Sequence, residues 1–135
     1  MADEISRETM FESLLEADPG LVPVWQEFVQ EWEGEPDPPI YLALSGVARY
    51  LVNELKAGAT DPFPAVFDVV EQWHIRGDHF VREAASVGLL EDLQNETLHE
   101  GTQPADFEPW LRPESLRWWR KVERFWSHGE LISDD

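Results

Sequence analysis

The sequence predicts an all-α single domain, covering residues 1–135, with about six helices packed as a bundle or a short α-solenoid. Apolar residues recur with a helical period in successive segments, whereas the apolar–polar alternation of strands is scarce. Pro and Gly interrupt this pattern at intervals of helix length, so each segment can fold back on its neighbours. The chain has 135 residues, of which 42% are hydrophobic and 12% aromatic, which is enough for a sizeable core.

The first three helices are expected over residues 4–17, 21–32 and 41–57. Asp18-Pro19-Gly20 interrupts the pattern between the first two, and a Pro-rich loop precedes the third. The third segment carries few charges and is expected to be the central helix, buried on most sides. The inward stripe of the second helix is Leu21, Trp25, Phe28, Val29 and Trp32.

The fourth and fifth helices are predicted to meet at a tight joint. Asp61 is the expected N-cap of the fourth helix, with Pro62 at its first position. Gly77 is the expected left-handed C-cap, and Asp78 is the expected N-cap of a fifth helix that continues to Leu93.

The sixth helix begins at Pro113 and is expected to end at Gly129. Its predicted inward stripe is Leu116, Trp119, Val122 and Trp126. Four cations share another face and are expected to pack against the acidic body of the protein or to be solvated. They are Arg117, Arg120, Lys121 and Arg124.

The segment EQWHIRGDHF, residues 71–80, contains several residues that recur in functional motifs. Its Arg-Gly-Asp tripeptide falls at the joint between two helices, where Gly and Asp have structural roles. Glu71 and His74 lie on one helical face, and His79 follows in the turn, so a metal-dependent enzyme using these three residues is one alternative. A di-iron bundle would need a second Glu-x-x-His motif and two further Glu residues.

Other catalytic signatures are missing from the sequence. There is no phosphate-binding glycine loop, no Gly-x-Ser-x-Gly motif, and no cysteine to act as a nucleophile or metal ligand. The sequence therefore predicts a protein that is not an enzyme and needs no cofactor.

The charge is strongly negative. Asp and Glu number 28 against 10 Lys and Arg, giving a net charge of −18. Residues 110–135 carry five acids and five bases, so the excess lies in residues 1–109. Such a field repels nucleic acid and anionic membranes and attracts basic proteins. The N-terminus has no apolar signal segment, and no apolar run reaches the roughly 18 residues of a membrane span, so a cytoplasmic protein is expected.

Two groups of acids lie at predicted helix C-termini, where the helix dipole disfavours negative charge. They are unselected solubilising residues or contacts for a cationic partner, and the sequence favours a partner for at least one group. The candidate contacts are Glu31, Glu33 and Glu35 in one group and Glu91, Asp92 and Glu96 in the other.

Two segments, VREAASVGLLEDLQN at residues 81–95 and WLRPESLRWWRKVERFW at residues 110–126, resemble a family of small, acidic, helical bacterial proteins of unknown function. Such proteins resemble the immunity proteins of polymorphic toxin systems, which are non-enzymatic. The resemblance brings no catalytic residues. The matching positions are Val87, Gly88, Leu89, Leu90, Glu91, Leu93, Gln94, Pro113, Glu114, Ser115, Trp118 and Trp119.

Together, these features favour a cytosolic, immunity-type binding protein that neutralises a basic toxin or effector domain by steric occlusion. The alternatives are the metal-dependent enzyme described above and an acidic mimic of nucleic acid. The oligomeric state stays open.

Overall fold

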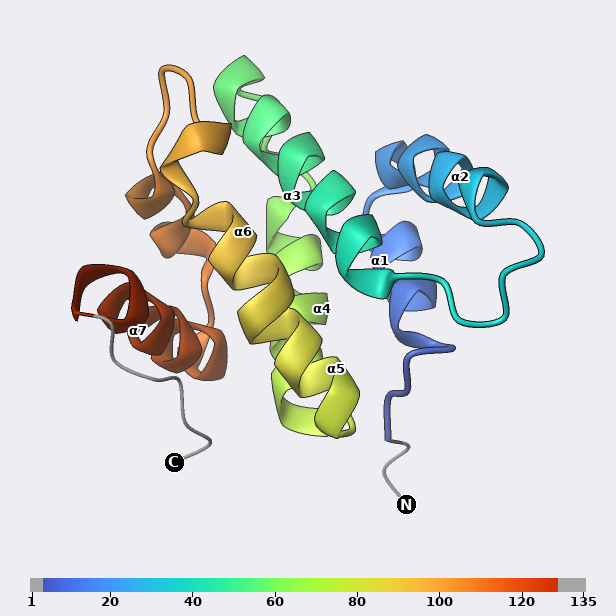
Figure 1. Cartoon of the computed structure of the whole chain (residues 1–135). Coiled ribbons are helices and arrows are strands. Elements are labelled where there is room, and N and C mark those ends of the chain that lie inside the picture. Colours follow the sequence, from blue (N-terminus) through green and yellow to red (C-terminus); the bar gives the residue numbers. More distant parts are fainter. Residues whose placement is uncertain (1–3, 129–135) are drawn as a thin grey trace.

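The protein folds as a set of helices, as the sequence predicts. The computed structural model describes residues 4–128, and its secondary structure there is helical apart from one isolated bridge between Ile5 and Gly77 (Figure 1). The helices are α1 (Met10–Ala17), α2 (Val22–Glu31), α3 (Ile40–Ala57), α4 (Phe63–Arg76), α5 (His79–Glu83), α6 (Glu91–Leu93) and α7 (Pro113–His128). A π-helix, Ala84–Leu90, joins α5 to α6, and 3₁₀ turns occupy Pro19–Leu21, Glu96–Leu98 and Pro104–Trp110.

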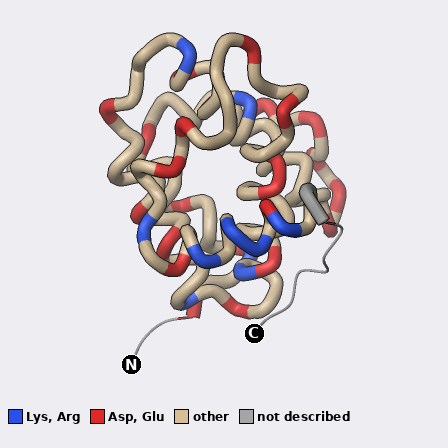
Figure 2. Tube along the Cα trace, turned by 90° about the vertical axis from the view of Figure 1, so that its left-hand side faces the viewer, with Lys and Arg blue, Asp and Glu red and all other residues tan. Residues whose placement is uncertain are grey.

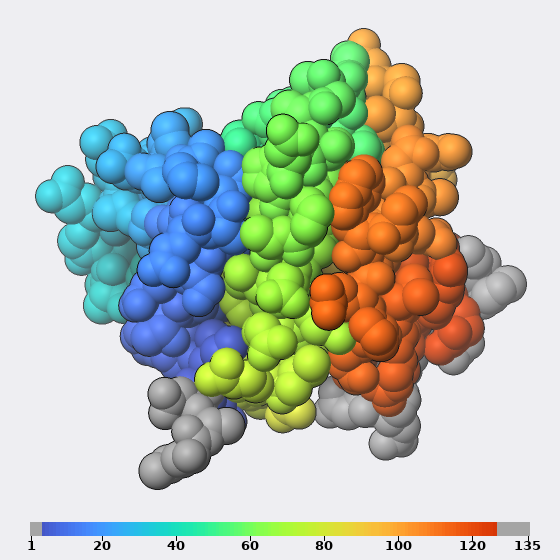
Figure 3. Space-filling model, turned by 180° about the vertical axis from the view of Figure 1, so that it is seen from behind, coloured from blue at the N-terminus to red at the C-terminus, as the bar shows by residue number. Residues whose placement is uncertain are grey.

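The helices form a closed bundle rather than a solenoid. The continuous helix made of α5, the π-helix and α6 crosses α3 and also packs against α4 and α7 (Figure 1). α1 packs on α4, and α4 packs on α7, although these helices are far apart in sequence. In the rear view α4 forms a central band between the N-terminal and C-terminal segments (Figure 3). A solenoid unit would contact only its sequence neighbours, so the bundle alternative is the one observed.

Aromatic side chains fill much of the core, as expected from the seven Trp and seven Phe of the sequence. Trp73 is completely buried, and its indole Nε1 donates a hydrogen bond to the carbonyl oxygen of Met10 at 3.1 Å, which joins α4 to α1. Phe63, Phe67 and Phe107 pack together between α4 and the 3₁₀ turn before α7. A buried indole needs a hydrogen-bond partner, and the Met10 carbonyl supplies it.

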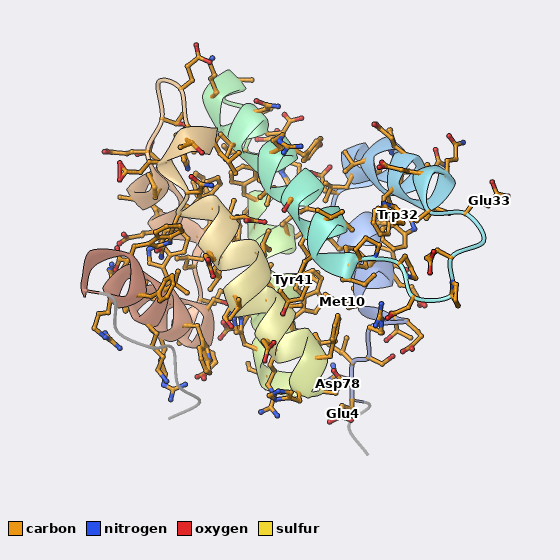
Figure 4. The ribbon with its side chains drawn as sticks, viewed as in Figure 1. Glu4, Met10, Trp32, Glu33, Tyr41 and Asp78 are labelled. Carbon is orange, nitrogen blue, oxygen red and sulfur yellow. The ribbon has the colours of Figure 1, made fainter. Side chains whose placement is uncertain are left out.

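The first helix begins later than predicted, at Met10 rather than at Glu4. The preceding segment does not continue the helix, because Ile5 pairs with the joint between α4 and α5 and residues 7–9 form a turn. Ile5 donates its N–H to the carbonyl of Arg76, and its own carbonyl accepts the N–H of Asp78, both at 2.9 Å. Glu4 and Asp78 accordingly lie together in Figure 4. Local periodicity cannot reveal such a long-range pairing.

Of the three predicted helix caps, the structure confirms one and overturns two. Asp78 accepts the N–H of Val81 at 2.9 Å and caps α5, as predicted. Gly77 is extended, with φ −71°, instead of left-handed. It is needed for close approach, because a Cβ atom there would collide with the carbonyl of Trp73 and the side chain of Val81. Asp61 does not cap α4, whose N-cap is Pro62 without a side-chain hydrogen bond.

Three apolar residues expected to be buried are exposed. Val29 on α2, Leu42 on α3 and Trp126 on α7 have 46%, 56% and 51% of their surface exposed. Leu42 lies on the narrow exposed side of α3, and the other sides of this helix are buried or half-buried, as predicted. The predicted stripe of α7 holds at Trp119 and Val122, which are fully buried.

The structural role of the Arg-Gly-Asp tripeptide can be tested by replacing Asp78, which caps α5. We expect Asp78→Ala to lower the free energy of unfolding by about 1 kcal/mol, because the N–H of Val81 loses its acceptor. Asp78→Asn keeps a capping oxygen and should melt close to the wild type in thermal denaturation. Equal melting temperatures for Asp78→Ala and wild type would contradict the assignment.

Candidate partner-binding surface

The carboxylate of Glu71 caps α7 from the side of α4. It is buried and accepts the backbone N–H of Glu114 at 3.0 Å, the backbone N–H of Ser115 at 2.8 Å and the hydroxyl of Ser115 at 2.8 Å. Burial acts to raise the pKa of Glu71, but these hydrogen bonds outweigh it and hold the pKa below its usual value. A carboxylate also suits the positive end of the helix dipole. Its oxygens are thus occupied by the fold.

His74, one turn further along α4, is buried in a neutral form. Its Nδ1 lies 3.0 Å from the carbonyl of Val70 and 3.2 Å from the hydroxyl of Ser115. Because a carbonyl can only accept, Nδ1 carries the proton and the buried Nε2, which has no hydrogen-bond partner, is bare. Burial lowers the pKa of His74 to about 4, and the Val70 hydrogen bond and the charge of Glu71 oppose this only in part.

The third residue of the metal hypothesis lies elsewhere. His79 is exposed in the first turn of α5, where its Nε2 contacts Glu83 at 3.4 Å. Within residues 4–128 no group of three or more His, Asp or Glu side chains is placed to hold a metal ion. The structure therefore does not bring Glu71, His74 and His79 together, and it gives two of them structural roles.

The basic stripe on α7 packs largely against acids of its own chain. Arg120 contacts Glu108 and Glu123, each at 2.8 Å, and Arg117 contacts Glu114 at 2.9 Å. The ammonium of Lys121 lies 4.3 Å from the ring centre of Trp118. The blue positions in Figure 2 include a group close to the C-terminal end of the described chain, whereas the red positions are spread over the rest. Two of these ion pairs, Arg117–Glu114 and Arg120–Glu123, are formed within α7 itself.

The first acidic group lies at the end of α2 and is solvent-exposed. Glu31 is the last residue of α2, and Glu33 and Glu35 follow in the loop to α3, which Arg7 anchors through Asp37 at 2.8 Å. Glu33 projects on the outer edge of the molecule beyond Trp32 (Figure 4). Among the ion pairs formed within residues 4–128, none involves Glu31, Glu33 or Glu35. These acids are available to an external cation.

The second acidic group is divided by the fold. Asp92 is half-buried and accepts the hydroxyl of Ser45 on α3 at 2.8 Å, so it is partly used inside the domain. Burial raises the pKa of Asp92, while the Ser45 hydrogen bond and nearby Arg49 oppose this. The pKa of Glu91 is raised, chiefly by burial and to a lesser extent by the negative charge of Asp92. Glu96 is exposed and borders a separate hollow of about 900 Å³ next to α7.

A groove of about 460 Å³ lies between α2 and α3 and brings Glu31 of the first group next to apolar surface. Glu27 and Glu31 line it from α2, and Leu42 and Arg49 line it from α3. Ser45, which binds Asp92, is part of the same lining. Figure 1 shows α2 and α6 on opposite sides of α3, so acids of both groups flank the exposed side of this helix.

Sequence reasoning missed the contribution of α3 to this surface. Leu42, Gly46, Arg49 and Asn53 recur at i, i+4, i+7 and i+11, and this more polar stripe in an otherwise apolar helix was the available signal. Glu27 belongs to the same surface and was not among the candidate contacts. Both stripes face one groove because α2 and α3 pack together, and the local sequence pattern does not reveal this packing.

Residues 11–127 match the model of a family described as Domain of unknown function (DUF7674). The chain belongs to this family. No curated protein and no solved structure matches the chain. In the part of the chain that the structure describes, no helix is long and apolar enough to cross a membrane.

Acid should destabilise the domain through His74. Its pKa is lowered by folding, so the unfolded chain binds the proton more readily and stability falls as the pH drops from about 6.5 to about 4. The loss attributable to His74 should approach about 3 kcal/mol at the lower limit. Glu71, whose pKa is also lowered, adds a loss at still lower pH, while Glu91 and Asp92 act in the opposite sense.

Urea denaturation of wild type and His74→Asn at several pH values isolates this contribution. Asn can still donate to the Val70 carbonyl but does not titrate. The difference in unfolding free energy between the two proteins should change steeply below pH 6.5. Parallel pH dependences would show that His74 is not buried in its neutral form.

The exposed acids at the end of α2 should be a liability in the free protein. We expect the triple variant Glu31→Gln, Glu33→Gln and Glu35→Gln to be as stable as wild type or more stable by up to about 1 kcal/mol at low salt, with the gain falling as salt rises. As a control, Glu108→Gln should be destabilising, since Glu108 contacts Arg120 and accepts the indole N–H of Trp119. Thermal melting at low ionic strength measures both, and a clearly lower melting temperature for the triple variant would mean that these acids pair within the fold.

Proposed function

We propose that this chain is a cytosolic binding protein of the immunity type, which neutralises a basic toxin or effector domain by covering its functional surface. The observation that carries the proposal is the exposed acidic group Glu31, Glu33 and Glu35, which forms no ion pair within residues 4–128 and of which Glu31 lines a groove with polar and apolar walls. The net charge of −18 and the resemblance to immunity proteins support it.

Electrostatics explains how such a protein would act. A strongly negative domain attracts a basic partner over several ångströms and speeds the encounter, so association is fast and depends on salt. Apolar contact in the groove would then slow dissociation, because apolar surface that is buried in the complex must be exposed to water again when the partner leaves. Occlusion requires no catalytic group in this chain.

The other sequence-based hypotheses receive no specific support. The metal hypothesis depends on three residues of which Glu71 caps α7, His74 is buried with its Nδ1 engaged, and His79 is exposed at another helix. Mimicry of nucleic acid would need acids spaced as phosphates along one face, and it stays a prediction of composition alone.

The test is co-expression with basic domains encoded next to this gene. We expect one of them to be toxic alone, to be tolerated with this protein, and to co-elute with it in size-exclusion chromatography. The association rate should fall by about tenfold or more between low and high salt. Loss of protection with retained folding is expected for the triple variant at Glu31, Glu33 and Glu35.

A matched control separates location from charge. Glu8, Glu12 and Glu16 are three exposed acids at and before α1, and their change to Gln lowers the net negative charge by the same amount. This control variant should slow association far less than the triple variant at α2. Absence of any complex with a neighbouring basic domain, or equal effects of the two triple variants, would contradict the proposed function or its surface.

A further inference from the structure

The groove between α2 and α3 has the form of a docking site for one helix. α2 and α3 are antiparallel, since Val24 near the start of α2 approaches Gly46 in the middle of α3, and Trp32 at the end of α2 lines the groove together with Leu42 near the start of α3. A Cβ atom on Gly46 would lie 3.3 Å from the side chain of Val24, so the helices are in close contact at the base of the groove.

Each wall presents a helical stripe of mixed character. Val24, Phe28 and Glu31 recur at helical spacing on α2, opposite the stripe of α3 that begins at Leu42. Leu42 is 56% exposed, an unusual state for a leucine in the first turn of a helix that otherwise contributes to the core. Leu42 and Trp32 thus supply apolar surface to the groove, and Glu31 lines it as well.

The negative charges of the groove walls favour a cationic partner. Glu27 and Glu31 are exposed on α2, and Asp92 lies across α3, where it binds Ser45. Arg49 is the cation among the lining residues, and its charge acts on Asp92. A second copy of this chain would bring another net charge of −18 to the same place, so self-association through the groove is disfavoured.

The dimensions fit one face of a helix of about three turns. From Leu42 to Asn53 the lining stripe of α3 runs for eleven residues, or about 16 Å at 1.5 Å per residue. A complete helix of that length and about 10 Å in diameter would occupy roughly 1,200 Å³, whereas the groove holds about 460 Å³. The groove thus receives a row of side chains, with the partner backbone outside it.

We infer that this groove binds an amphipathic, cationic helix of the partner, with apolar side chains at helical spacing against Leu42 and Trp32 and Lys or Arg against Glu27 and Glu31. The inference rests on the proposed function and specifies the partner surface. Addition of a strand is disfavoured, because both walls are helices whose backbone groups are already hydrogen-bonded within the helix.

A synthetic peptide provides a direct probe. We would use an acetylated and amidated 14-residue peptide with Leu at i, i+3, i+7 and i+10 and Lys or Ala elsewhere, and a control peptide of the same composition with the Leu residues placed at alternate positions. Titration into ¹⁵N-labelled protein should shift amide signals of α2 and α3 with the first peptide. The control peptide should bind at least about tenfold more weakly, because it cannot present one apolar helical face.

Matched variants then localise the contact. Leu42 and Ile75 are aliphatic residues of similar exposure, 56% and 57%, on different helices. Leu42→Ser should weaken peptide binding by about tenfold or more, whereas Ile75→Ser should leave it unchanged. Glu27→Gln with Glu31→Gln should weaken binding most at low salt. Thermal melting shows whether each variant is folded.

Each outcome either supports or overturns the inference. Equal binding of the two peptides, equal effects of Leu42→Ser and Ile75→Ser, or no binding at all would overturn it. If the partner found by co-expression binds but is indifferent to Leu42→Ser, the groove inference fails while the proposed function stands. If the helical peptide occupies the groove but no neighbouring domain is neutralised, the proposed function fails and the groove remains a helix-binding site.

Discussion

The hydrogen bonds from the first turn of α7 to the carboxylate of Glu71 hold the C-terminal helix against the rest of the bundle. Two backbone N–H groups that α7 cannot satisfy internally, and the hydroxyl of Ser115, all converge on this one buried side chain. The same contact places Ser115 beside His74, whose ring stacks with that of Trp118. Removing this carboxylate would leave buried donors of α7 unpaired at the α4–α7 contact.

The packing of α7 in this way also determines where the surface of the protein carries a net negative charge. Its Arg117 and Arg120 pair with Glu108, Glu114 and Glu123, and the carboxylate of Glu71 is engaged inside the fold. Around the end of α2, Arg7 pairs with Asp37, whereas Glu31, Glu33 and Glu35 form no ion pair within residues 4–128. The asymmetry that the sequence shows as a balanced tail and an acidic body thus becomes, in three dimensions, a difference between two surfaces.

Much of the fold follows from local sequence pattern, and its exceptions arise from contacts distant in sequence. The predicted helix positions, the cap at Asp78 and the burial of Trp119 depend on periodicity and local hydrogen bonding, and the structure bears them out. The late start of α1 could not be predicted, because it depends on the pairing of Ile5 with the α4–α5 joint. Exposure of the acids after α2 was predictable from polarity, whereas the groove required knowledge of how α2 and α3 pair.

The π-helix between α5 and α6 makes the length of this segment a constraint in its own right. It runs from Ala84 to Leu90, and its wider turn sets the angle between the faces presented by α5 and by α6. The π-helical turn already accommodates one residue more than an α-helical turn, so a further inserted residue would rotate everything after it by about 100° relative to α5. Asp92 would then turn away from Ser45, and Gln94 would lose the carbonyl of Trp119, to which its amide now donates at 2.8 Å. Across the family, this stretch should therefore tolerate substitution more readily than the insertion of another residue.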